Sequence, residues 1–279
     1  MLKQRIITAI VLLALLSPAL FASSAQPLAI LSLVLIAAAA WEWGRLNGLS
    51  MRGALRCAAS CLLICFLSWA ARWADEPPPM LWPLVGALWV LGGGWLVRRG
   101  VAGWPRIPRV LRLIGGVVAL SATWVAMFQA KLYGTNFLFS LLLLVWMADI
   151  AAYFSGRALG RHKLAVQISP GKSWEGVWGG MLGVAVLAVI WIWFDKHWPV
   201  DSLSLFSRLY AQGWFFLVLT IFFLVAMSVL GDLVESLVKR SAGMKDSSQL
   251  LPGHGGVLDR VDALLPTLPL ALMTLQSLS

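Results

Sequence analysis

Residues 236–262 read SLVKRSAGMKDSSQLLPGHGGVLDRVD, a polar stretch between two long apolar segments. The stretch contains eight ionisable side chains: Lys239, Arg240, Lys245, Asp246, His254, Asp259, Arg260 and Asp262. Ionised groups are costly beside hydrocarbon unless they are paired or functional. So dense a group of charges at the edge of apolar segments therefore indicates a functional site at a membrane surface.

The composition of the chain places it in a membrane. Of its 279 residues, 60% are hydrophobic and 12% are charged, with a mean hydropathy of +0.83. Soluble proteins carry about 25% charged residues. A net charge of +10 would suggest nucleic acid as the partner of a soluble protein, but here basic cytoplasmic loops account for it, and we expect no nucleic-acid partner.

Several apolar segments approach the roughly 20 residues that a helix needs to cross a bilayer. We predict an all-α, polytopic protein with nine spans, at residues 5–22, 26–42, 54–72, 79–97, 111–131, 136–156, 177–195, 212–231 and 260–277. Alternate loops collect the positive charge, including Lys3 and Arg5, and all but four of the 22 Lys and Arg residues fall on one side. The positive-inside rule then predicts an N-in, C-out topology.

Three local patterns allow simpler interpretations. The basic, apolar N-terminal segment could be a signal peptide, although the charge alternation works best if it remains as the first span. Cys57, Cys61 and Cys65 share one helix face, which favours helix contact over a metal site or a disulfide framework. The overlapping glycine pairs in GVWGGMLG (176–183) predict close helix packing.

Acidic residues at the end of the eighth predicted span suggest a cation site. Asp232, Glu235, Ser236 and Lys239 are spaced to share one helix face. Carboxylates at a membrane boundary suit Mg²⁺, which favours oxygen ligands together with phosphates. The alternative is an interfacial salt bridge to Lys239.

The glycine-rich segment that follows adds the features of an anion site. Residues 252–256 predict a tight turn, whose backbone N–H groups can point at an anion. Asp259 and Asp262 follow and could complete a metal cluster with Asp232. Carboxylates, cations and a glycine turn together suit a polyphosphate ligand. His254 is expected to bind phosphate or the loop backbone rather than to carry protons.

A second loop, ISPGKSWEG (168–176), has the same mixed character. It holds Ser169, Lys172 and Ser173 between the sixth and seventh spans. In the sixth span lies Asp149, with Tyr153 one turn later. An acid at a helix centre costs about 2.5–3.5 kcal/mol on insertion scales, so a functional role is expected there, with a structural hydrogen bond as the alternative.

These residues together resemble a known signature. The run from Ser236 to Asp262 is similar throughout to the signature of the phosphatidate cytidylyltransferase (CDP-diacylglycerol synthase) family, and SPGKSWEG resembles a second block of that family. The resemblance covers roughly residues 145–265. Gly171 stands where relatives often carry Lys, and Ser248 replaces a frequent glycine.

The resemblance implies an enzyme that converts CTP and phosphatidate into CDP-diacylglycerol and pyrophosphate. It implies Mg²⁺, alone or with a second cation, a homodimer, and a bacterial inner membrane with the site at the cytoplasmic face. We expect lipid-facing helices in residues 1–135 and the catalytic site in 136–279. The implied catalytic residues are Asp232, Asp246, Asp259, Lys239 and Lys245, and the implied metal ligands are Asp232, Asp259 and Asp262. The implied substrate-binding residues are Ser169, Lys172, Ser173, Ser236, Arg240, His254, Gly255, Gly256, Arg260, Asp149 and Tyr153.

Three other functions stay open at this point. A CTP-dependent kinase of the polyprenol or phytol type would transfer the γ-phosphoryl group to a lipid alcohol. A transporter would use Asp149 as an ion site, but it would place its site midway in repeated, broken helices, and no repeat is visible. An inactive lipid-binding homologue is disfavoured by the intact aspartates.

Overall fold

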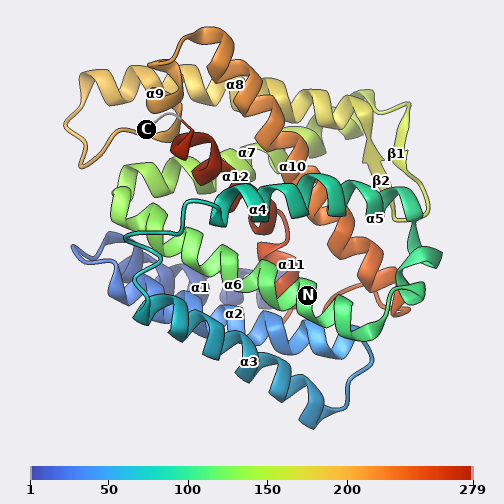
Figure 1. Cartoon of the computed structure of the whole chain (residues 1–279). Helices are drawn as coiled ribbons and strands as arrows, with labels where there is room; N and C mark the ends of the chain where they lie inside the picture. Colours follow the sequence, from blue (N-terminus) through green and yellow to red (C-terminus); the bar gives the residue numbers. More distant parts are fainter. Residues whose placement is uncertain (1, 278–279) are drawn as a thin grey trace.

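Long helices packed side by side form nearly the whole protein (Figure 1). The computed structural model describes residues 2–277, without the side chains of residues 2–6, Ala9 and Leu12. The side chains of Lys3 and Arg5, which carry two of the predicted cytoplasmic charges, therefore lie outside the description. The all-α prediction is confirmed, apart from one short hairpin.

Seven helical segments in the described chain are long and apolar enough to cross a membrane. They are α2 (Gln26–Leu46), α3 (Met51–Ala70), the continuous segment α4–η1–α5 (Leu81–Arg99), α6 (Arg109–Tyr133), α7 (Thr135–Leu159), α8 (Trp174–His197) and α10 (Trp214–Ser241). The remaining elements are α1 (Leu2–Phe21), η2 (Val101–Arg106), β1 (Lys163–Ala165), β2 (Ser169–Ser173), α9 (Leu205–Tyr210), α11 (Leu258–Val261) and α12 (Leu264–Gln276).

These seven segments match the second to the eighth predicted spans. Helix α1 covers the first predicted span, but part of its side chains lies outside the description. The ninth predicted span is not one continuous helix, because the chain turns between α11 and α12. With 13 residues, α12 is about 20 Å long, which is less than the roughly 30 Å of a hydrocarbon core.

Glycines bring α7 and α8 into close contact, as the small-residue spacing predicts. A Cβ atom at Gly180 would lie 2.9 Å from the carbonyl oxygen of Ala148, and one at Gly176 would lie 3.0 Å from that of Ala152. Such distances leave no room for a side chain. Helix α7 is thereby held against the start of α8, where the second predicted site loop ends.

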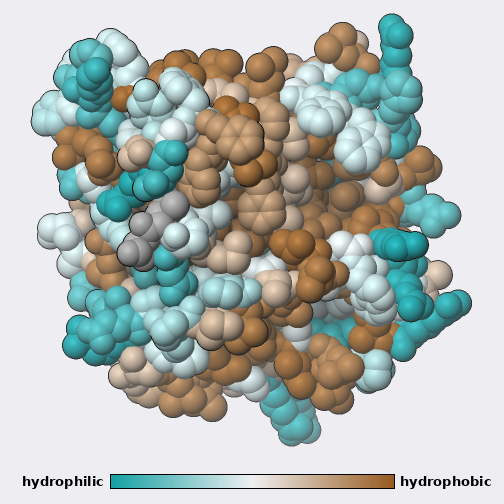
Figure 2. Space-filling view, turned by 45° about the horizontal axis from the view of Figure 1, so that its top comes forward, coloured by the Kyte–Doolittle hydropathy of each residue, from teal (hydrophilic) through white to brown (hydrophobic). Residues whose placement is uncertain are grey.

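Polar side chains gather at the two ends of the bundle. Figure 2 shows an apolar band across the middle of the visible face, with hydrophilic residues at its left and right edges. An apolar band between polar ends is the pattern of a protein that crosses a bilayer. The β-hairpin and the charged end of α10 lie at the same end of the bundle (Figure 1).

Candidate active site at the charged end of α10

A cavity of about 550 Å³ collects residues from both predicted site blocks. Its walls come from α7, the β-hairpin, the start of α8 and α10. Six residues that we singled out from the sequence line it: Asp149, Tyr153, Ser169, Lys172, Ser173 and Asp232. Segments up to about 80 positions apart thus meet in one polar pocket, as a nucleotide site requires.

The β-hairpin presents Lys172 to this cavity. Strands β1 and β2 pair antiparallel, with Lys163 opposite Ser173. At the end of the hairpin, Ser173 caps α8, because its hydroxyl accepts a hydrogen bond from the N–H of Gly176. The Glu175 carboxylate accepts a hydrogen bond from the backbone N–H of His162 at 3.1 Å, which connects the first turn of α8 to the residue before β1. We expected a loop here, and the strands are too short for a sequence pattern to reveal.

Lys172 joins the hairpin to α10 through an ion pair. Its Nζ lies 2.6 Å from Oδ2 of Asp232, and both side chains are partly exposed. The other oxygen, Oδ1, accepts a hydrogen bond from Ser236 at 3.1 Å. The cationic side chain of Lys172 therefore already pairs with Asp232.

A second, more deeply buried network starts one turn further along α10. Lys239 lies between two carboxylates, 2.5 Å from Oε2 of Glu235 and 2.6 Å from Oδ1 of Asp259. The side chains of Glu235 and Asp259 are 2% and 5% exposed. The predicted salt bridge of Lys239 is thus present, and it ties α10 to α11.

Asp259 also organises the glycine loop before it. Its Oδ2 accepts three hydrogen bonds, from the N–H and hydroxyl of Ser247 and from the N–H of Gly256. Burial by itself raises the pKa of Asp259, but these bonds and Lys239 outweigh it and hold the pKa at about 2. A Cβ atom at Gly255 would come within 2.6 Å of Oδ2, and its φ of +81° also favours glycine.

Asp262 lies on the side of the network that faces Asp232. Asp262 interacts electrostatically with the carboxylates of Asp232 and Asp149. Among residues 2–277, however, no three His, Cys, Asp or Glu side chains are arranged to hold a metal ion. The three carboxylates of the predicted cluster, Asp232, Asp259 and Asp262, therefore do not form one metal-binding group in the described structure. Asp259 instead pairs with Lys239 and accepts hydrogen bonds from the loop.

The remaining predicted residues surround the loop on its outer side. Arg240, Lys245, Asp246 and Arg260 are exposed. Nδ1 of His254 is buried and has no hydrogen-bond partner among the described residues. These positions lie beyond the lining of the 550 Å³ cavity, so the structure places the predicted phosphate-binding cations in two groups rather than one.

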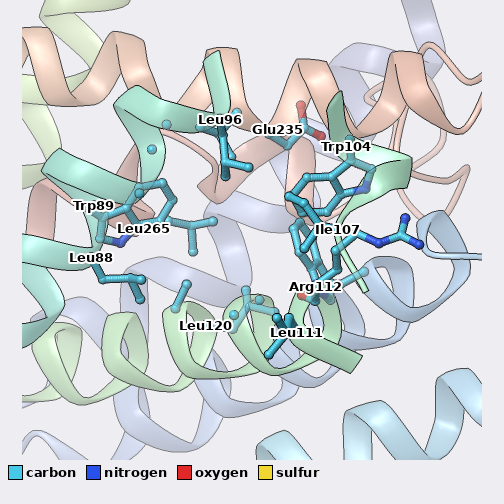
Figure 3. Close-up of a pocket in the computed structure, with 18 of the residues that line it drawn as sticks. Leu88, Trp89, Leu96, Trp104, Ile107, Leu111, Arg112, Leu120, Glu235 and Leu265 are labelled. Carbon is cyan, nitrogen blue, oxygen red and sulfur yellow. The ribbon is translucent and has the colours of Figure 1, made fainter. Parts of the chain in front are cut away.

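An apolar cavity of about 220 Å³ lies against a neighbouring stretch of α10. Figure 3 shows Glu235, Trp104 and Arg112 at one end, and Leu88 and Trp89 at the other. The π-helical turn η1 (Leu88–Gly93) forms part of its wall. The cavity thus runs from the charged end of α10 into the apolar part of the bundle.

Glu42, in α2, is a site residue that the sequence analysis missed. Its side chain is completely buried, and its carboxylate accepts hydrogen bonds from the loop that carries Asp259. The available signal was an acid inside an apolar helix, the same signal that drew attention to Asp149.

Comparisons with known proteins identify the family of the chain. The profile described as "Cytidylyltransferase family" matches residues 3–278. The chain belongs to the cytidylyltransferase family. It is 36% identical to a phosphatidate cytidylyltransferase of Pseudomonas aeruginosa over 96% of this chain and 95% of that protein. It is 50% identical to one of Haemophilus influenzae over 49% of this chain, an alignment that spans 44% of that protein. A Bacillus subtilis relative of the same name is 40% identical over 49% of this chain and 46% of its own length.

Proposed function

We propose that this cytidylyltransferase family member transfers the cytidylyl group of CTP to phosphatidate, giving CDP-diacylglycerol and pyrophosphate. The observation that carries the proposal is the Lys172–Asp232 pair, which joins the SPGKSWEG block to α10, four residues before the Ser236–Asp262 run, in one polar cavity. The relatives named above are phosphatidate cytidylyltransferases, and one of them aligns over nearly its whole length. Transfer to a phosphate is therefore favoured over the lipid-kinase alternative.

The reaction displaces pyrophosphate at the α-phosphorus of CTP. A phosphate oxygen of phosphatidate forms a new bond to this phosphorus as the bond to the β-phosphate oxygen breaks. Both reactants are anions, so positive charge must reduce their repulsion and stabilise the leaving group. We assign Lys172, Ser169 and Ser173 to the CTP phosphates, with Asp149 and Tyr153 in the same cavity. Little acid–base chemistry is needed, so positioning carries most of the rate.

We assign the exposed basic residues around the loop to binding of the pyrophosphate product. Arg240, Lys245 and Arg260 lie outside the cavity lining and can meet a departing pyrophosphate from the aqueous side. Lys239, Asp246, Ser236, His254, Gly255 and Gly256 stay assigned to the site on the resemblance. Lys239 also holds Asp259 in place.

We assign Mg²⁺ to Asp232, which lines the polar cavity, together with Asp262. Mg²⁺ uses one or two carboxylates together with substrate phosphates, so a preformed protein cage is not required. Asp232 and Asp262 fit this donor set, because their carboxylates lie close enough to repel one another. Asp259 retains a lone pair only on Oδ1, beside Lys239, and is the third candidate ligand. When bound, the metal supplies positive charge to the phosphates.

We assign one acyl chain of phosphatidate to the apolar cavity in Figure 3. Its charged end, at Glu235 and Arg112, would face the head group, and its apolar end would hold the chain. Nε of Arg112 is buried with no hydrogen-bond partner among the described residues, as expected for a group reserved for an anion. An acyl chain gains little free energy on leaving lipid for such a cavity, so the cavity orients the substrate rather than capturing it.

The finer topology belongs to the same proposal. We propose nine spans in a bacterial inner membrane, with α1 as the first and the broken pair α11–α12 together as the ninth. The N-in, C-out orientation then puts the charged end of α10 in the cytoplasm, where CTP is found. Basic residues at that end of the bundle support this orientation. We also propose a homodimer, on the resemblance alone, which light scattering with correction for detergent would test.

The experiment that tests the activity measures pyrophosphate. Purified protein in detergent, with CTP and Mg²⁺, should release one pyrophosphate for each CDP-diacylglycerol formed, and only when phosphatidate is present. Replacing phosphatidate with a polyprenol or phytol tests the kinase alternative in the same assay. Formation of a lipid monophosphate from the alcohol, without pyrophosphate, would contradict the proposal.

A further inference from the structure

Glu42 connects the N-terminal helices to the catalytic loop. The residue lies in α2, more than 200 positions from the loop, and its side chain is completely buried. Among the ion pairs of the described chain, none includes Glu42. A buried carboxylate needs hydrogen-bond donors to replace its lost hydration, and here the loop provides them.

Four donors reach the two oxygens of this carboxylate. Oε1 accepts from the hydroxyl of Ser248 at 2.5 Å and from the N–H of Val257 at 2.9 Å. Oε2 accepts from the hydroxyl of Ser247 at 3.0 Å and from the N–H of Leu258 at 2.7 Å. Two donors precede the glycine turn and two follow it, so one side chain holds both ends of the loop together.

The same contacts link Glu42 to Asp259. The hydroxyl of Ser247 lies 3.0 Å from Glu42 and 2.9 Å from Oδ2 of Asp259, so it lies between the two carboxylates. Leu258, whose N–H binds Glu42, is the residue before Asp259. Gly256 fits between them only because it lacks a side chain, since a Cβ atom there would overlap Glu42 and Ser247. Ser247 and Leu258 therefore connect the position of the Glu42 carboxylate to that of Asp259.

We propose that Glu42 is a positioning residue for cytidylyl transfer, which sets the loop of residues 247–258 in the conformation that places Asp259. The inference rests on the proposed function of Asp259 in the reaction. The proposal gives the N-terminal half of the chain a role in shaping the site. Ser248, where relatives often carry glycine, adds a donor that this chain uses to bind Glu42.

The test compares Glu42→Gln with Glu76→Gln. Glutamine keeps the shape of Glu42, but its amide nitrogen cannot accept, so the donors on one side lose their partner. Glu76 is exposed in the connection between α3 and α4, and its replacement removes the same charge without touching the loop. A misplacement of about 1 Å can cost on the order of 10²-fold in rate, so Glu42→Gln should lower kcat by about that factor. The KM for CTP should stay near the wild-type value, because Glu42 does not line the polar cavity.

Trypsin measures the loop independently of the reaction. Lys245 is exposed beside the held segment, and Arg72 is exposed in the α3–α4 connection. Loosening of the loop should speed cleavage after Lys245 at least about tenfold while cleavage after Arg72 keeps its rate, since local opening exposes only the opened segment. In the double variant Glu42→Gln/Ser248→Ala, the loss in kcat should be smaller than the product of the losses in the two single variants, because both substitutions remove the same contact.

Two results would overturn the inference. One is wild-type kcat in the Glu42→Gln protein. The other is cleavage after Lys245 and Arg72 that rises by the same factor, which means that Glu42 supports only overall stability. If the wild-type protein has no turnover, the proposed function fails, and the ratio of the two cleavage rates alone decides whether Glu42 holds the loop.

Discussion

Replacing Asp259 with Asn tests the buried network directly. The Asp259 side chain is 5% exposed, pairs with Lys239 through Oδ1 and accepts three hydrogen bonds through Oδ2. Asparagine has a single acceptor oxygen, so its NH₂ group must face either the ammonium group or the loop donors. Removing one partner of a buried ion pair costs about 3–5 kcal/mol, and the lower end applies here because Lys239 keeps Glu235.

The expected activity loss is larger than this stability loss can explain. We expect Asp259→Asn to insert and fold but to lose at least about 10³-fold in turnover, or about 4 kcal/mol of transition-state stabilisation. The assay is CDP-diacylglycerol formation in detergent, with thermal unfolding followed on the same sample. The matched control is Asp195→Asn, which changes a carboxylate that accepts four hydrogen bonds at the end of α8 remote from the hairpin. It should destabilise the protein while retaining turnover within about tenfold of wild type, because it leaves Asp259 in place. Near-wild-type turnover in Asp259→Asn, or equal activity losses in the two variants, would refute this reasoning.

Three further predictions follow from the two cavities. Lys172→Met leaves Asp232 without its ion-pair partner and should raise the KM for CTP at least about tenfold with little change in the KM for phosphatidate; the opposite pattern would place CTP elsewhere. Gly115→Leu places a side chain in the open space of the apolar cavity and should lower kcat/KM for long-chain but not for short-chain phosphatidate. The control, Gly94→Leu, also meets open space but lies outside the cavity lining, so it should leave kcat/KM for both substrates unchanged. Chelation of divalent cations should abolish turnover, and added Mg²⁺ should restore it. The Asp232→Asn protein should need a higher Mg²⁺ concentration than wild type for half-maximal turnover. Turnover that survives chelation would exclude the assigned metal role.

The helical segments could be predicted because their signal is local. Apolar runs of the right length gave seven segments whose boundaries agree with the structure to within a few residues, apart from the C-terminal end of α10. That end runs ten residues beyond its predicted limit, since the predicted span stopped at the charges, which a helix can continue through at a membrane surface. The break between α11 and α12 was not apparent, because hydropathy does not report where a helix turns.

The candidate site could be predicted in its residues but not in its partners. Spacing placed Asp232, Glu235 and Lys239 on one helix face, yet the structure divides them: Asp232 faces Lys172, while Glu235 and Lys239 face Asp259. Asp232 and Glu235 differ by about 60° in direction, and Lys239 lies about 10 Å further along the helix than Asp232, so these residues meet different neighbours. The partners of Glu42 could not be predicted, because its donors lie more than 200 positions away.

The central claim is cytidylyl transfer, and the fate of the CTP phosphates tests it most directly. Purified protein in detergent would receive phosphatidate, Mg²⁺ and CTP labelled at the α-phosphorus in one reaction and at the γ-phosphorus in another. The mechanism predicts label in the extracted lipid only from the α-labelled CTP, with the γ label recovered as pyrophosphate. Label in the lipid from the γ-labelled CTP, with a lipid alcohol added, would identify a kinase and contradict the account.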